Sequence, residues 1–187
     1  YLESLATVQF SSVIIDCLLQ LSAMIWHLDT NLGINHRDLK PSNFLIVEHE
    51  KSIKIINIES DILEIESRHS LTFIDFGFSC IGSTETHICD ISLSTVYSKS
   101  DPCPKNGRDM YLFLAFLYID YYNKLPSKLI SLFESWLNIP ETNICKFMRK
   151  DKENSKKWIY FMTGTEKIKQ FNSCPSKIIK DLQAYLV

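Results

Sequence analysis

The chain has 187 residues, of which 45% are hydrophobic, and its 20 basic and 22 acidic side chains give a formal net charge of −2. This length fits one domain, and this share of apolar residues is enough to bury a core. Nucleic-acid-binding domains normally carry an excess of basic residues, so we expect no nucleic-acid partner.

The six cysteines are scattered along the chain without a CxxC pair. This favours reduced thiols and therefore an intracellular, reducing compartment: cytoplasm or nucleus, in a host cell if the protein is viral. The alternative is a zinc site with four candidate ligands: Cys80, His87, Cys89 and Cys103. Their spacing matches no standard zinc finger. No apolar run reaches the ~18 residues that span a bilayer and no signal peptide is visible, so we expect no membrane partner.

The first predicted element is a long, largely buried helix. Its apolar residues recur at spacings of four, three, four and three: Ile14, Leu18, Leu21, Ile25 and Leu28. Gly33 is typical of a helix C-terminus. A loop follows, in which Pro41 excludes a regular helix, and residues 44–47 form a short apolar strand.

Further along, residues 71–75 predict a second short strand that leads into Gly77. Residues 79–107 are rich in Ser, Thr, Pro, Gly and Asp and predict a long loop. The segment 108–122 is apolar nearly all round and predicts a central buried helix. A helix is also expected over residues 129–137. Another helix is expected at the C-terminal end, with Pro175 at an early position and Ser173 as its N-cap. The segment 148–157 is expected to be a charged loop or an exposed helical face. The fold class is therefore mainly α with short β hairpins.

Two short motifs carry the chemistry. The run His36-Arg37-Asp38-Leu39-Lys40-Pro41-Ser42-Asn43 matches the protein-kinase catalytic loop at every specified position. Asp75-Phe76-Gly77 follows an apolar strand and matches the metal-binding DFG element. The chain thus resembles the C-terminal lobe of eukaryotic-type serine/threonine protein kinases, most strongly over residues 13–80, and is similar to divergent kinases of large DNA viruses.

The resemblance implies a domain of residues 1–187 and a role for each part of it. The catalytic loop would cover 34–46, the DFG element and activation segment 75–107, the central helix 108–122, and a divergent helical part 123–187. A glycine-rich loop and a strand lysine are not found in this sequence, so the N-terminal lobe is missing and is expected upstream of Tyr1.

The implied activity is transfer of the ATP γ-phosphate to a serine or threonine hydroxyl of a protein substrate, with ATP and Mg²⁺ as cofactors. In this reading Asp38 accepts the hydroxyl proton, Lys40 contacts the transferring phosphate, and Asn43 and Asp75 ligate Mg²⁺. Lys40 at its position is typical of serine/threonine kinases.

Supporting roles are implied for five further residues. His36 would pack beneath the turn of Phe76 and Gly77, and the Asp109 carboxylate would hold the catalytic-loop backbone. Arg37 would pair with a phosphate on the activation segment, where many acceptors are possible: Ser79, Ser83, Thr84, Thr86, Ser92, Ser94, Thr95, Tyr97 and Ser98.

The sequence departs from the family in three places. Asn43 and Asp75 are 32 positions apart, more than a short hairpin needs, so residues 48–70 are interpreted as an insertion and Asn57 stays a rival metal position. The Ala-Pro-Glu that ends the activation segment is absent. Without an N-terminal lobe, residues 1–187 alone are expected to bind ATP poorly and to transfer little phosphate.

Two other functions compete with an active protein kinase. A pseudokinase would keep the fold as a scaffold or binding module with little or no phosphotransfer, but a scaffold needs none of Asp38, Lys40 and Asn43. A small-molecule kinase is the third hypothesis, and its loops usually lack the Lys-Pro-x-Asn run that is present here.

Overall fold

A computed structural model describes residues 2–51, 53–58, 61–82, 87–90, 103–139, 143–164 and 171–186; for 53–64 and 87–90 the backbone alone is described. The helices are α1 (Thr7–Trp26), α2 (Arg108–Tyr121), α3 (Ser127–Leu137), α4 (Ile144–Lys150), α5 (Lys152–Thr163) and α6 (Pro175–Leu186). The strands are β1 (Ile34–Asn35), β2 (Phe44–Glu48), β3 (Ile53–Ile58), β4 (Asp61–Glu66), β5 (His69–Phe73), β6 (Cys80–Gly82) and β7 (His87–Asp90). The fold is therefore mainly helical with short antiparallel hairpins, as the sequence predicts.

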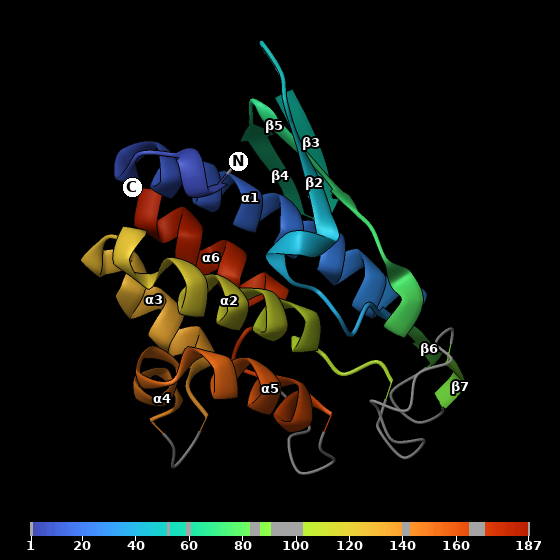
Figure 1. Ribbon diagram of the computed structural model, residues 1–187. Helices are drawn as coiled ribbons and strands as arrows, with labels where there is room; N and C mark the ends of the chain where they lie inside the picture. Colours follow the sequence, from blue (N-terminus) through green and yellow to red (C-terminus); the bar gives the residue numbers. More distant parts are fainter. Residues whose placement is uncertain are drawn as a thin grey trace.

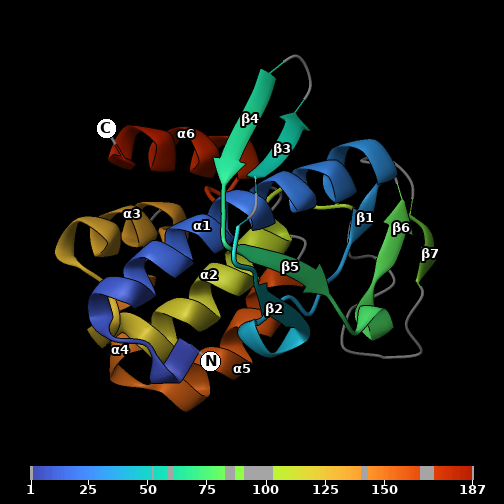
Figure 2. The ribbon, with the colours of Figure 1, turned by 90° about the horizontal axis from the view of Figure 1, so that it is seen from above.

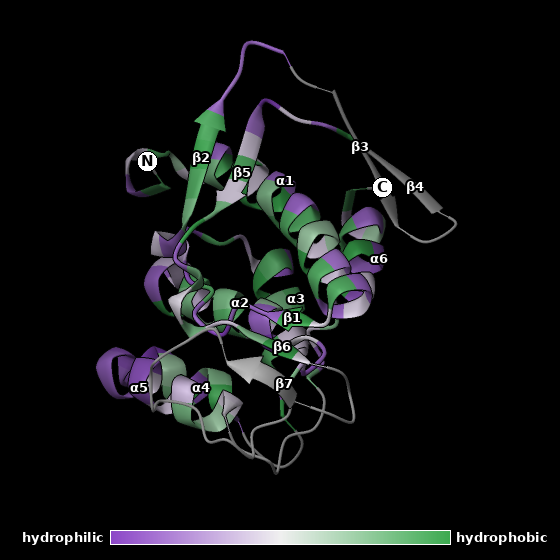
Figure 3. Cartoon of the chain, turned by 90° about the vertical axis from the view of Figure 1, so that its right-hand side faces the viewer, coloured by the Kyte–Doolittle hydropathy of each residue, from purple (hydrophilic) through white to green (hydrophobic). Residues whose placement is uncertain are grey.

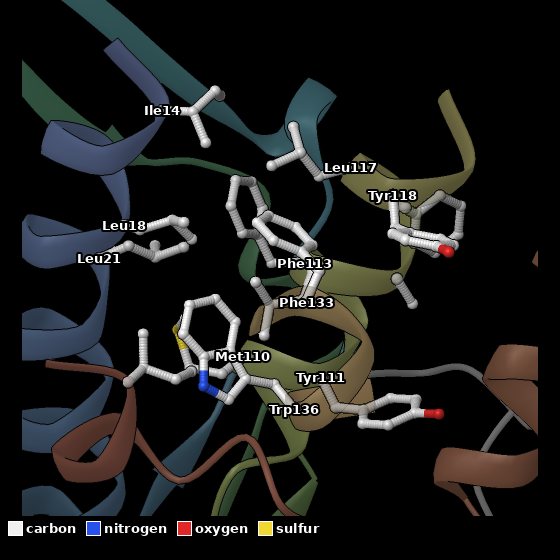
Figure 4. Packing of buried hydrophobic residues seen from close by; sticks show 14 of the residues in the cluster. Ile14, Leu18, Leu21, Met110, Tyr111, Phe113, Leu117, Tyr118, Phe133 and Trp136 are labelled. Carbon is white, nitrogen blue, oxygen red and sulfur yellow. The ribbon is translucent and has the colours of Figure 1, made fainter. Parts of the chain in front are cut away.

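Helix α2 lies in the middle of the molecule, between α1 and α6 on one side and α4 and α5 on the other (Figure 1). All but its last two residues are buried, which agrees with the apolar character of the segment all round its axis. The side chains of Ile14, Leu18 and Leu21 face this helix from α1. Close packing continues through Phe113 of α2 to Phe133 of α3 (Figure 4).

The first helix ends as the sequence predicts. Regular α1 continues into a π-helical turn, His27–Leu32, and Gly33 closes it with φ 63°. A side chain is excluded here, because a Cβ atom on Gly33 would lie 2.1 Å from the carbonyl oxygen of Gly82. This close approach allows β1, which starts at the next residue, to pair with β6.

By length and mean hydropathy, the segment Thr7–Leu32 could cross a membrane, which differs from the expectation that no apolar run is long enough. Its most apolar window is 67% buried inside the protein. The helix is apolar because it packs against α2, α6 and β5, and it serves as a core helix in this structure.

Three small antiparallel sheets lie beside the helices. Strand β2 pairs with β5, β3 pairs with β4, and β1-β6-β7 form the third sheet. The β3–β4 hairpin contains most of the segment interpreted as an insertion, and it projects above α1 (Figure 2). A buried network anchors its base, in which the Gln20 amide of α1 donates to the Ser67 hydroxyl (2.9 Å) and the His69 carbonyl (2.8 Å).

Several local expectations are corrected or refined. Residues 79–107, predicted as loop, contain the strands β6 and β7. Of the two forms predicted for the charged segment 148–157, the helical one is found: it forms the end of α4 and the start of α5, with Asp151 between them. Pro175 opens α6 as predicted, but Ser173 is not its cap; the Ser173 hydroxyl donates instead to the carbonyl of Gly107, 2.9 Å away.

The expectation of six reduced thiols is wrong at two positions, because Cys80 and Cys103 form a disulfide. Strand pairing puts Cys80 opposite Asn35, and the Asn35 side chain accepts a 2.6 Å hydrogen bond from the backbone of Lys105. The two cysteines are thereby brought to a Cα separation of 6.2 Å, within the usual range for a disulfide. The proposed zinc site therefore loses two of its four ligands.

Candidate functional site

The loop of residues 36–43 is held from below by a buried carboxylate. Asp109, in the first turn of α2, is fully buried, and its two oxygens accept hydrogen bonds from the backbone N–H groups of His36 (2.7 Å) and Arg37 (2.8 Å). This is the contact that the kinase resemblance implies for Asp109. Burial raises the pKa of Asp109, and the nearby His36 side chain and the two backbone donors oppose that rise.

Asp38 lies at the centre of the loop and is 4% exposed. The Lys40 ammonium donates to both of its carboxylate oxygens, at 3.1 and 2.9 Å. The Asn43 amide donates to the Asp38 carbonyl and to its Oδ2 atom, both at 2.8 Å. The structure therefore brings three of the predicted site residues into one hydrogen-bonded group.

Strand pairing brings the backbone next to the fourth predicted residue, Asp75, to the loop. In the β2–β5 register Phe44 lies opposite Phe73, and the Ile74 N–H donates to the Asn43 carbonyl (3.0 Å). Asp75 is the next residue, so it comes alongside the loop although it lies 32 positions away in sequence. Asn57, the rival position, lies in β3 and pairs with Ile62 of β4 in a separate sheet.

His36 connects the loop to the Asp75 turn. Its Nε2 atom lies 3.0 Å from the Ile74 carbonyl oxygen, and its ring centroid is 4.7 Å from that of Phe76. A carbonyl only accepts hydrogen bonds, so Nε2 carries the proton. Nδ1 is then free to accept the 3.4 Å contact from the backbone N–H of Asp38.

Two residues of the site, Arg37 (φ 67°) and Asp75 (φ 64°), are the described non-glycine residues with positive φ. This conformation is strained for such residues and persists where the surroundings impose it. The Arg37 backbone is fixed by Asp109, and the Asp75 side chain accepts a 3.4 Å hydrogen bond from the Gly77 backbone. Strain of this kind gathers at functional sites, which supports the choice of this loop as the candidate site.

The residues described contain no cluster of three or more His, Cys, Asp or Glu side chains that could hold a metal ion. Asn43 and Asp75 nevertheless fit Mg²⁺, because this ion prefers oxygen ligands and is commonly bound by one or two protein groups together with water and phosphate oxygens. The Asp75 carboxylate is exposed, and the Asn43 Oδ1 atom has a 3.4 Å contact from the Ser42 hydroxyl. Both oxygens are thus chemically suited to coordinate an ion.

A cleft of about 480 Å³ opens beside the loop and lies within the usual size range of ligand sites. Lys40, Ser42 and Leu45 form part of its wall, together with Phe116 and Asp120 from α2. Leu45 is 54% exposed and Val47 is 49% exposed, so β2 presents an apolar edge at the surface (Figure 3). The cleft therefore combines an apolar wall and a hydroxyl with two lysines and two carboxylates, Glu3 and Asp120, while Asp38, Asn43 and Asp75 do not line it.

A second buried network holds Asn35, the residue before the loop, and sequence reasoning missed it. The Asp29 carboxylate accepts hydrogen bonds from the Asn35 amide (2.7 Å) and the Gly107 backbone (3.4 Å). Burial, and next the nearby charge of Asp109, raise the pKa of Asp29 well above its ordinary value. No local sequence motif predicts this network, because its members lie up to 78 positions apart in sequence.

Sequence reasoning also missed Tyr160 of α5. Its hydroxyl donates to the Oδ1 atom of Asp38 and lies 3.5 Å from the Lys40 ammonium. Of the candidate phosphate acceptors, Ser79 is buried and contacts the His36 carbonyl (3.4 Å). The other eight lie outside the described residues, so the structure does not address the pairing expected for Arg37.

No family model, curated protein or solved structure matches this chain. The functional argument therefore depends on the sequence motifs and on the geometry of the site.

Proposed function

We propose that the chain is the C-terminal lobe of a serine/threonine protein kinase that transfers the γ-phosphate of ATP to a protein hydroxyl. The observation that carries this proposal is the hydrogen-bonded group of Asp38, Lys40 and Asn43, with Asp75 delivered beside it by the β2–β5 pairing. A scaffold does not need a carboxylate base, a cation and two oxygen ligands close together.

Each residue of the group has a chemical task in phosphoryl transfer. Asp38 would orient the acceptor hydroxyl and take its proton, and such general-base assistance contributes roughly 10²–10⁴-fold. Lys40 would place a positive charge at the transferring phosphate. Asp109 would keep the loop in its strained conformation through the two backbone N–H groups, and so acts as a positioning residue.

Asn43, Asp75 and Leu45 have the chemistry to bind Mg²⁺ and ATP. Asn43 and Asp75 would hold the ion, which when bound supplies positive charge that neutralises the phosphates. Leu45 offers an apolar surface to an adenine ring at the edge of the cleft.

The test is a phosphotransfer assay with radiolabelled ATP, Mg²⁺ and dephosphorylated casein, on the longest form of the polypeptide that can be expressed. We expect Asp38→Asn and Asp75→Asn each to lower the rate by roughly 100-fold or more. Glu48→Gln is the matched control. Glu48, the last residue of β2, forms an exposed ion pair with Arg68, and loss of this ion pair leaves the 36–43 loop intact. Full activity in Asp38→Asn would exclude the proposal, and full activity in Asp75→Asn would return the metal site to Asn57.

One observation favours the pseudokinase alternative. Asp38 is nearly buried and all its described acceptor positions have donors, so a base in this state has no open position for a substrate. An ATP-binding protein with no phosphotransfer in the same assay would support this second function.

A further inference from the structure

Within the part of the chain that the structure describes, Tyr160 is the side-chain hydrogen-bond partner that Asp38 receives from a distant segment, 122 positions away. It lies near the end of α5, and its ring packs on Phe116 of α2 at a centroid distance of 5.5 Å. The Tyr160 hydroxyl is thus presented to the 36–43 loop by a helix that packs on the core.

The hydrogen bonds of Asp38 leave no place for a further donor. A carboxylate has about four acceptor positions. Lys40 donates to both oxygens, Asn43 donates to Oδ2, and Tyr160 donates to Oδ1. Lys40 and Asn43 belong to the loop itself, so an incoming hydroxyl has to take the position of Tyr160.

The Tyr160 hydroxyl also has the chemical environment that an acceptor alcohol needs. It is a neutral O–H that donates to the carboxylate, and the Lys40 ammonium lies 3.5 Å from its oxygen. An alcohol about to attack a phosphate next to Asp38 would make the same two contacts.

We propose that the hydroxyl of Tyr160 occupies the acceptor-hydroxyl subsite of Asp38, so that a protein substrate has to displace it before phosphate is transferred. This inference rests on the proposed kinase function and adds a residue that competes with the acceptor hydroxyl for Asp38. Tyr160 is here an intramolecular competitor and forms no covalent bond.

The first experiment needs no knowledge of the natural substrate. In Tyr160→Phe the ring stays on Phe116 but the hydroxyl is gone, so water gains access to Asp38. We expect hydrolysis of Mg-ATP without a protein acceptor to rise roughly tenfold, the factor for one hydrogen bond to a charged group. The KM for dephosphorylated casein should fall by a similar factor, with kcat little changed.

Tyr185→Phe is the matched control, because Tyr185 is a partly buried tyrosine of α6 and should leave both rates unchanged. A fall of kcat in Tyr160→Phe at unchanged KM would overturn the inference, since it would show that the phenol positions Asp38 for catalysis. Phosphate found by mass spectrometry on Tyr160 of the wild type would also overturn it, because the phenol would then be an acceptor.

A double-mutant cycle separates failure of this inference from failure of the proposed function. If the hydroxyl sits on Asp38, the melting-temperature shifts of Tyr160→Phe and Asp38→Ala are not additive in the double variant, because alanine, unlike asparagine, removes the acceptor. Additive shifts would overturn the contact and the inference, whatever the activity. Coupled shifts without transfer or hydrolysis above the Asp38→Asn background would instead reject the kinase function, and the acceptor role with it.

Discussion

Asp109 shows how one buried side chain determines the conformation of a loop far away in sequence. Its carboxylate is desolvated, which by itself is unfavourable, and the backbone N–H groups of His36 and Arg37 compensate it. The same two bonds fix Arg37 at φ 67°. The shape of the 36–43 loop is therefore set by α2 as much as by its own residues.

We expect Asp109→Ala to lower the free energy of unfolding by about 2–5 kcal/mol, because it leaves two buried N–H groups without their acceptor. Urea denaturation followed by circular dichroism measures this loss. Asp120→Ala is the control, since Asp120 forms a partly exposed ion pair with Lys156 that is worth about 1 kcal/mol or less. Equal losses for the two variants would show that Asp109 does not hold the loop.

Asp29 makes the stability of the protein depend on pH. Its folded-state pKa is raised well above the ordinary 3.8, chiefly by burial, so the folded protein favours the protonated form. The contribution of protonated Asp29 to the free energy of unfolding is complete below pH 3.8. It is lost as pH rises through the higher folded-state pKa of Asp29.

We therefore expect the unfolding free energy of the wild type to fall relative to that of Asp29→Asn as pH rises from about 4 towards 7, by at most about 1.4 kcal/mol per pH unit. Urea titrations of both proteins across this range measure the difference. A difference that does not change with pH would show that Asp29 keeps an ordinary pKa.

At the scale of elements, the site depends on pairings that join distant segments. The β2–β5 ladder spans the β3–β4 hairpin and still brings Asp75 to Asn43. The β1–β6 pairing fixes Asn35 and Cys80, and the disulfide then ties β6 to the chain before α2. The hairpin is tolerated because the ends of its segment are held by β2 and β5, and the entropy of loop closure grows slowly with length.

The disulfide gives a prediction at this scale. We expect the variant with both Cys80→Ser and Cys103→Ser to lose about 3 kcal/mol of unfolding free energy under non-reducing conditions, the value typical for a loop of this length. A dithiol reductant should bring the wild type towards the variant without changing the variant. Cys174→Ser, at a free cysteine, serves as control; an unchanged stability of the double variant would show that the bond does not form.

For the whole molecule, the helices enclose a large core, whereas β2, which is coloured as hydrophobic in Figure 3, has the exposed residues Leu45 and Val47. In the proposed function, Leu45 and Val47 would give an adenine ring a surface on one side, and the cleft that Leu45 lines is open to solvent. We expect residues 1–187 alone to bind Mg-ATP with a Kd near or above about 1 mM, because contact on one side recovers little of the cost of association.

Isothermal calorimetry with Mg-ATP measures this affinity. Leu45→Ala should weaken it further if the adenine packs there, whereas Leu186→Ala, at an exposed leucine of α6, should not. Micromolar binding by this segment alone would contradict the prediction.

The sequence by itself determined the elements whose signal is local. The spacing of apolar residues in 14–28 and the unbroken apolar run in 108–122 predicted α1 and α2, and Gly33 predicted where the first helix ends. The residues 36–43 and 75–77 were singled out by their identities, because the side-chain types and their order define each motif. For such features the physical cause lies within one or two turns of chain.

Only the tertiary structure decided how these pieces meet. It paired β2 with β5 so that Ile74, the residue before Asp75, bonds to Asn43; it also joined Cys80 to Cys103, buried Asp29 beside Asp109, and brought Tyr160 onto Asp38. Each of these contacts is made by groups between 23 and 122 positions apart, where neither periodicity nor propensity carries information. Their geometry follows from strand register and helix packing, which exist once the whole chain has folded.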